Sequence, residues 1–109
     1  MNQIQQIDAE LQRVVRRLIS EYGAQQVILF GSMASDSMTE QSDVDLVVIK
    51  ETPLPFFDRL KEVADIGAWH YPFDVLVYTP SEFDDMSQNN AFVRDEVVRK
   101  GKVLYAKAG

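Results

Sequence analysis

Three short runs rich in β-branched and aromatic residues constrain the fold of this chain more than any other feature. They read QQVILF (residues 25–30), DVDLVVIK (43–50) and FDVLVYTP (73–80). A strand with one face in water alternates apolar and polar residues, whereas these runs are apolar at successive positions after their first residues. We therefore expect three strands of one sheet that is covered, at least in part, on both faces.

Helical patterns separate these runs and would supply the cover. Residues 4–22 place apolar side chains at three- and four-residue spacings, and Gly23 follows as a C-terminal cap. Similar patterns span residues 56–69 and 81–100, and KVLYA (102–106) is predicted to add a last short strand. This order of elements predicts an α/β (α+β) fold in which helices cover a small sheet.

Composition limits the protein classes that need to be considered. The 109 residues are typical of one domain, so a single domain is expected over residues 1–109. Cysteine is absent from the sequence, which excludes disulfides and cysteine-bound zinc. The apolar runs are too short to span a bilayer, and the N-terminal sequence does not match a signal peptide, so a cytoplasmic location is expected. The net charge of −6, with eleven scattered basic residues, argues against direct binding to a nucleic-acid backbone.

Two carboxylates lie at the start of the second predicted strand. Asp43 and Asp45 are two residues apart, so in a strand their side chains project from the same face. Magnesium and manganese prefer oxygen ligands, and a pair of carboxylates can bridge two such ions. Asp74 lies at the start of the third strand and would join them if that strand lies beside the second. The sequence therefore predicts an acidic metal site at one edge of the sheet.

A Gly-Ser pair follows the first predicted strand. Gly31 allows close approach of the backbone to a ligand, and Ser32 adds a hydroxyl group. Backbone N–H groups at such a turn suit phosphate oxygens. A phosphate cradle beside a carboxylate-bound metal pair is the arrangement that nucleotidyl transfer requires.

The whole pattern resembles that of the polymerase β-type nucleotidyltransferase superfamily. It consists of Gly-Ser, ten residues, Asp-x-Asp and a later strand aspartate. The leading helix and the ending RDEVVRKGKVLYA resemble the minimal nucleotidyltransferase (MNT) branch, including the MntA-like antitoxins of HEPN/MNT toxin–antitoxin pairs. The resemblance covers nearly the whole chain and implies that family's fold, a small mixed β-sheet with helices packed on it.

The resemblance also implies a role for each candidate residue. Gly31 and Ser32 would hold the β and γ phosphates of a nucleoside triphosphate, with ATP as the expected substrate. Asp43 and Asp45 would bind two Mg²⁺ ions, for which Mn²⁺ could substitute. Asp74 would bind the catalytic metal and help to deprotonate the incoming hydroxyl group.

The loop after Gly-Ser departs from the family pattern. Family members often carry a basic residue just after the pair and again two positions on, whereas this chain has Met33 and Ser35 there. The loop up to Asp43 contains no Lys or Arg and adds Asp36 and Glu40. We therefore expect this chain to bind a triphosphate more weakly than is usual in the family.

The minimal branch suggests a partner protein. Many of its members are antitoxins encoded beside a helical HEPN toxin, an RNase, and some transfer AMP to a tyrosine of that toxin. Because larger relatives carry extra domains that hold their acceptors, a core of this length is expected to borrow its acceptor site from a partner. The first alternative is an antitoxin that neutralises its partner by occlusion, with weak or no catalysis. The second is nucleotidyl transfer to a small molecule with the help of a partner subunit.

Overall fold

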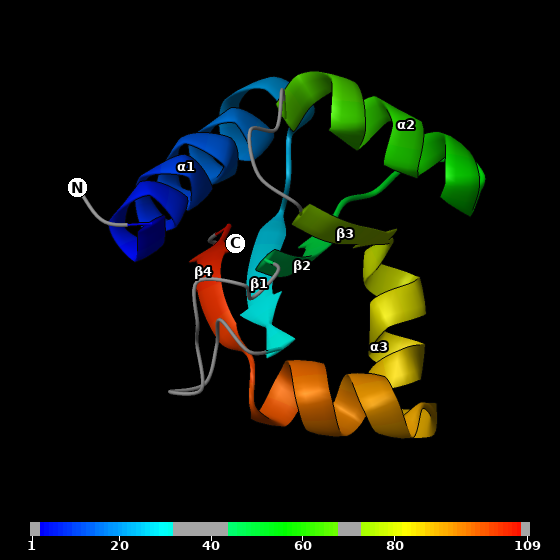
Figure 1. Cartoon of the computed structure of the whole chain (residues 1–109). Coiled ribbons are helices and arrows are strands. Elements are labelled where there is room, and N and C mark those ends of the chain that lie inside the picture. The colour runs from blue at the N-terminus through cyan, green and yellow to red at the C-terminus, as the bar shows by residue number, and fades with distance from the viewer. Residues whose placement is uncertain (1–2, 32–43, 68–72, 108–109) are drawn as a thin grey trace.

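The computed structural model describes residues 3–31, 44–67 and 73–107 (Figure 1). In chain order the elements are α1 (Gln3–Arg17), the π-helix η1 (Leu18–Tyr22), β1 (Gln26–Phe30), β2 (Val44–Ile49), α2 (Phe56–Gly67), β3 (Phe73–Tyr78), α3 (Pro80–Asn89), the π-helix η3 (Val93–Arg99) and β4 (Lys102–Ala106).

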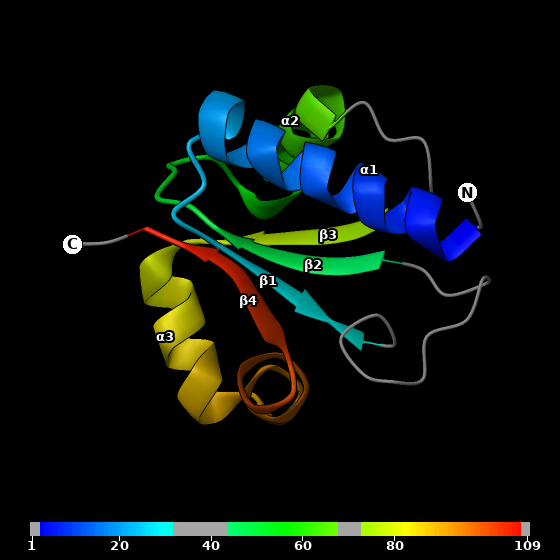
Figure 2. The same cartoon turned by 90° about the vertical axis from the view of Figure 1, so that its left-hand side faces the viewer.

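The four strands form one mixed sheet in the order β3-β2-β1-β4. Strand β1 pairs antiparallel with both β2 and β4, whereas β2 pairs parallel with β3. Figure 2 shows α1 and α2 on one face of this sheet, and α3 with η3 on the other. The predicted fold class, a small mixed sheet with helices packed on it, is confirmed.

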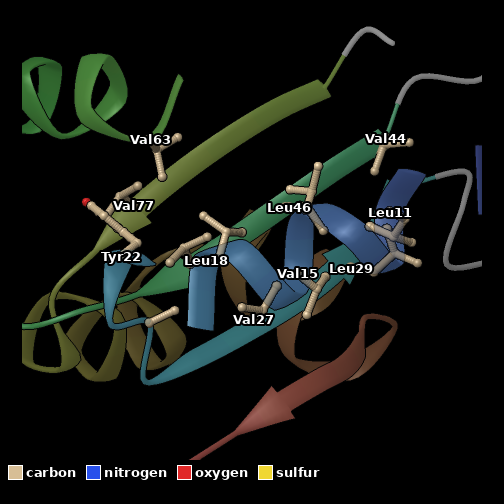
Figure 3. Close-up of a cluster of buried hydrophobic side chains, with 13 residues drawn as sticks. Leu11, Val15, Leu18, Tyr22, Val27, Leu29, Val44, Leu46, Val63 and Val77 are labelled. Atoms are coloured by element: carbon tan, nitrogen blue, oxygen red, sulfur yellow. The ribbon is translucent and has the colours of Figure 1, made fainter. Parts of the chain in front are cut away.

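The face under α1 and α2 carries the larger part of the core. Leu18 of η1, Leu46 of β2 and Val77 of β3 are almost fully buried there (Figure 3). Complete burial of one such side chain contributes about 1.5–3 kcal/mol relative to its exposure. The opposite face packs Ile28 and Val47 with residues of η3. Both faces of the central strands are therefore covered, as the apolar runs indicate.

Residues 81–100 are helical, as predicted, but in two segments rather than in one continuous helix. Helix α3 ends at Asn89, and Asn90 has an extended backbone with φ −119° and ψ 113°. The Asn90 side-chain oxygen accepts a hydrogen bond from the Val93 N–H at 3.1 Å, so it caps the following helical segment. Asparagine side chains compete in this way with the backbone bonds of a helix, which explains the break.

The first helix also differs in detail from its prediction. Its regular part ends at Arg17 and continues as the π-helix η1 to Tyr22. Gly23 is in the left-handed conformation, and its N–H bonds to the carbonyl of Leu18. The predicted cap at Gly23 is therefore confirmed.

Candidate functional site

Asp45 and Asp74 lie side by side at one edge of the sheet. They are direct partners in the parallel pairing of β2 with β3, and Asp45 is also paired with Phe30 at the end of β1. Paired residues of neighbouring strands point to the same face of a sheet. The two carboxylates therefore project from the face that carries α3 and η3, where β1 ends and β2 and β3 begin. Asp45 is half-buried and Asp74 is exposed.

Gly31 is in direct contact with the first of these carboxylates. Its φ is +76°, a conformation that favours glycine. A Cβ atom built on Gly31 would lie 2.3 Å from Oδ2 of Asp45 and 3.3 Å from its Cγ. A larger residue would therefore require the Asp45 carboxylate to shift. The fold therefore places Gly31, directly after β1, against the candidate acidic site.

Two predicted site residues, Ser32 and Asp43, lie outside the described residues. Within residues 3–31, 44–67 and 73–107, no group of three or more His, Cys, Asp or Glu residues is placed to hold a metal ion. The described part of the site is the pair Asp45 and Asp74. Carboxylate oxygens from two adjacent strands fit a hard cation such as Mg²⁺. Their role as metal ligands stays a prediction.

An aromatic pair lies beside the carboxylates. Phe30 packs edge-to-face on Phe92, with ring centroids 5.8 Å apart and an angle of 85° between the ring planes. Phe92 precedes η3 and leaves half of its surface exposed. The sequence pattern indicates only that Phe92 is an apolar residue of a helix. Its position next to the site follows from the packing of that helix under β1.

A groove of about 390 Å³ runs beside Asp74. It is lined by three residues of α2 and four consecutive residues of β3, namely Leu60, Val63, Ala64, Phe73, Asp74, Val75 and Leu76. Sequence reasoning missed this groove because its location depends on β3 being the outer strand of the sheet. The only signal in the sequence is that Asp74 begins an apolar run.

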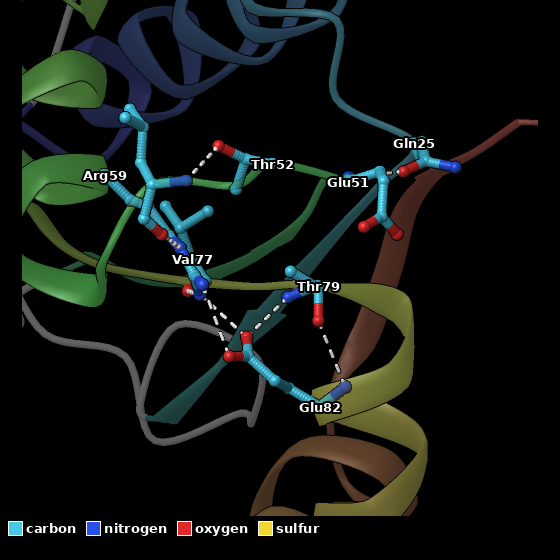
Figure 4. Close-up of polar contacts among 8 residues, drawn as sticks. Gln25, Glu51, Thr52, Arg59, Val77, Thr79 and Glu82 are labelled. Atoms are coloured by element: carbon cyan, nitrogen blue, oxygen red, sulfur yellow. Dashed lines mark hydrogen bonds and ion pairs between the residues drawn. The ribbon is translucent and has the colours of Figure 1, made fainter.

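A buried arginine anchors β3 at the end opposite to Asp74. Arg59 of α2 pairs with Glu82 of α3 at 2.7 Å and donates further bonds to the carbonyls of Leu54 at 2.7 Å and Val77 at 3.2 Å (Figure 4). The Arg59 guanidinium, followed by the backbone N–H of Thr79, holds the pKa of Glu82 below its usual value. This network joins α2, β3 and α3, and so fixes the strand that carries Asp74.

None of the helices in the described ranges has the length and hydropathy needed to cross a membrane.

Comparison with known proteins points to one family. A family model described as "Polymerase beta, Nucleotidyltransferase" matches residues 12–108. A crystal structure of a presumed nucleotidyltransferase from Sulfolobus solfataricus is similar to the whole fold, with a TM-score of 0.69 and 20% sequence identity. The similarity covers 95% of this chain and 83% of the other. No curated protein sequence matches the chain.

Proposed function

Because the chain belongs to the polymerase β nucleotidyltransferase family, we propose that it transfers AMP from ATP to a hydroxyl group of a partner protein. The observation that carries this proposal is the contact of Gly31 with Asp45, together with the pairing of Asp45 and Asp74. The Gly31 backbone beside these carboxylates supports binding of a metal–triphosphate complex.

Each residue of the site has a distinct task in this proposal. Gly31 and Ser32 bind the phosphate oxygens of the triphosphate through backbone N–H groups and the Ser32 hydroxyl. Asp43, Asp45 and Asp74 hold the cations. Bound Mg²⁺ would neutralise the negative charge of the phosphates and of the departing pyrophosphate.

The transfer itself needs one proton acceptor near the incoming hydroxyl group. The hydroxyl oxygen forms a bond to the α-phosphorus of ATP, and the bond between that phosphorus and pyrophosphate breaks. The hydroxyl proton passes to the carboxylate of Asp74, which is exposed and can be reached by an acceptor from outside. Pyrophosphate leaves with the electron pair of the broken bond.

The partner and the biological role follow from the resemblance to the antitoxin branch. We infer a helical HEPN-type toxin as the acceptor, which AMP transfer would silence. The net charge of −6 suits a basic partner. The location that goes with this role is cytoplasmic.

The deciding experiment is an intact-mass spectrum of the partner encoded beside this protein, co-purified and treated with ATP and Mg²⁺. We expect the partner to gain one or more AMP units. The variant Asp43→Asn/Asp45→Asn should bind the partner without modifying it. The variant Asp65→Asn/Asp84→Asn removes two exposed charges elsewhere and should behave as wild type.

Other outcomes point to the alternatives. A stable complex in which the partner's mass never changes, and in which the toxin stays inhibited by the Asp43→Asn/Asp45→Asn variant, would favour neutralisation by occlusion. A mass gain on added aminoglycosides or sugars, but not on the partner, would favour transfer to a small molecule.

A further inference from the structure

The groove beside Asp74 follows the outer edge of β3 rather than either face of the sheet. Successive side chains of a strand point to opposite faces. Phe73, Asp74, Val75 and Leu76 nevertheless all line the same groove. A hollow along the edge of the strand accounts for contact with four residues in a row, because residues of both faces meet at that edge.

This edge can present backbone hydrogen-bonding groups to a ligand. β3 is the terminal strand of the sheet, and no other described strand pairs with its outer side. The carbonyl of Val77 faces outward, since it accepts a hydrogen bond from Arg59, whereas the carbonyl of Tyr78 bonds toward Lys50 after β2. By alternation, the N–H and C=O groups of Val75 also face outward. Val75 thus lies between Val77, whose carbonyl is occupied by Arg59, and the carboxylate of Asp74.

Helix α2 supplies an apolar wall along the same edge. Leu60 and Ala64 are four residues apart on one side of α2 and are only partly covered, and Val63 forms the floor. Phe57 lies three residues before Leu60 and is 76% exposed. An apolar strip therefore runs along α2 from Phe57 toward the end of the groove at Asp74.

We propose that this groove binds an extended segment of the acceptor protein as an added strand beside β3. This inference rests on the proposed function, because the segment would deliver its hydroxyl group to Asp74. Outward backbone groups at Val75 suit a polypeptide, which can pair with them as a further strand of the sheet. A lipid or a sugar has no matching row of amide groups.

The geometry also sets which side chains the segment should carry. A residue opposite Asp74 shares its face of the sheet, and the next residue, opposite Val75, points toward α2. The first of these carries the hydroxyl group. The second should be apolar, because Leu60, Val63 and Ala64 surround its position.

The test uses a heptapeptide library with a fixed central Ser, Thr or Tyr, together with ATP and Mg²⁺. We expect transfer of AMP to the central residue, with a preference for an apolar residue adjacent to it. Ala64→Arg places a long charged side chain in the groove and should reduce peptide modification by at least about tenfold. The matched control Ala9→Arg alters an exposed alanine of α1 and should modify peptides as wild type does.

Two further measurements distinguish a failure of this inference from a failure of the proposed function. They are the binding of ATP and Mg²⁺ by each variant and the modification of the intact partner. If folded Ala64→Arg binds ATP as wild type does but no longer modifies peptides, the result supports the groove as the binding site of the acceptor segment. If Ala64→Arg fails to fold, Leu60→Ser gives the same comparison with a smaller change.

Equal peptide modification by wild type and the groove variants would overturn the inference. So would a wild-type protein that modifies its intact partner but no peptide. A wild-type protein that binds no ATP would instead overturn the proposed function, and the groove inference with it.

Discussion

At the scale of single residues, the contact between Gly31 and Asp45 shapes the candidate site. Both Gly31 and Gly23 have φ +76°, but only Gly31 has a neighbouring side chain where a Cβ atom would lie. Gly23→Ala should cost about 1–2 kcal/mol through its left-handed backbone alone. Gly31→Ala should cost more, because the added methyl group meets Asp45. Urea unfolding of the two variants measures the difference.

The double variant Gly31→Ala/Asp45→Ala serves as the control for this prediction. Removal of the carboxylate relieves the collision, so the second change should recover part of the stability that Gly31→Ala loses. Equal unfolding free energies for Gly31→Ala and Gly23→Ala would contradict the contact.

The ion pair of Arg59 and Glu82 predicts a specific dependence of stability on pH. The guanidinium lowers the pKa of Glu82 in the folded protein. The stability that this carboxylate contributes is therefore complete above its ordinary pKa of 4.5, and it is lost as the pH falls through the lower folded value. Glu82→Gln should be less stable than wild type by about 1 kcal/mol at pH 7, a modest figure because the Glu82 side chain is 45% exposed.

Thermal unfolding at pH 7 and pH 3 checks this sign. The difference in melting temperature between wild type and Glu82→Gln should narrow at pH 3. This pH lies below the ordinary pKa of 4.5, so the unfolded chain takes up a proton there and the stability that the carboxylate contributes is falling. A difference in melting temperature that is larger at pH 3 than at pH 7 would show that the carboxylate does not act through Arg59.

Spacing along the chain predicted which individual residues belong to the site better than it predicted which residues pack against them. The placement of Asp45 at the start of a strand, and its relation to Gly31, could be proposed from the sequence. The pairing of Asp45 with Asp74 required β3 to lie beside β2, which the sequence could state only as a condition. The burial of Arg59 was not foreseen, because its partner Glu82 is twenty-three residues away in another helix.

At the scale of elements, the start of α3 depends on a capping box. The Thr79 hydroxyl accepts a hydrogen bond from the Glu82 N–H at 3.2 Å, and the Glu82 carboxylate accepts one from the Thr79 N–H at 2.8 Å. Thr79→Val keeps the shape of the side chain but removes the hydroxyl group, and should cost about 1 kcal/mol. Thr79→Ser keeps the hydroxyl group and should cost less. Denaturant unfolding ranks the two variants, and a lower stability of Thr79→Ser would contradict a capping role.

The break between α3 and η3 shows a limit of periodicity. The apolar spacing continues through Phe83, Met86, Val93 and Val97, so the sequence favours one helix. All four side chains do face the same cluster under the sheet. Asn90 interrupts the backbone while the apolar face continues on both sides of it. Periodicity therefore predicted most of the buried face, although the apolar residues Phe92 and Val98 of the same segment are exposed, and it did not predict the break in the helix.

At the scale of the whole molecule, one end of the sheet carries the Arg59 network and the other end carries the candidate site. The Arg59 network joins α2, the end of β3 and the start of α3. Nearby, the Lys50 N–H after β2 bonds to the carbonyl of Tyr78 at the end of β3. Asp45 and Asp74 lie at the other end of the sheet, where β2 and β3 begin, beside Gly31. Strand order decides this division, because only adjacent β2 and β3 bring Asp45 to Asp74. Local pattern alone does not specify strand order, which is why the sequence predicted the layers but not the groove along β3.

Binding of ATP and Mg²⁺ should stabilise the whole molecule if the site has the proposed role. A ligand at a hundred times its dissociation constant adds about 2.7 kcal/mol to the unfolding free energy. For a domain of about this size, each kcal/mol raises the melting temperature by about 4–8 °C. We therefore expect thermal unfolding to shift upward by about 10 °C or more with both ligands present. Asp45→Asn/Asp74→Asn should lose most of that shift, whereas Asp65→Asn/Asp84→Asn, which changes net charge equally, should keep it. Equal shifts in the two double variants would mean that ATP binds without these carboxylates, and the proposed site would be wrong.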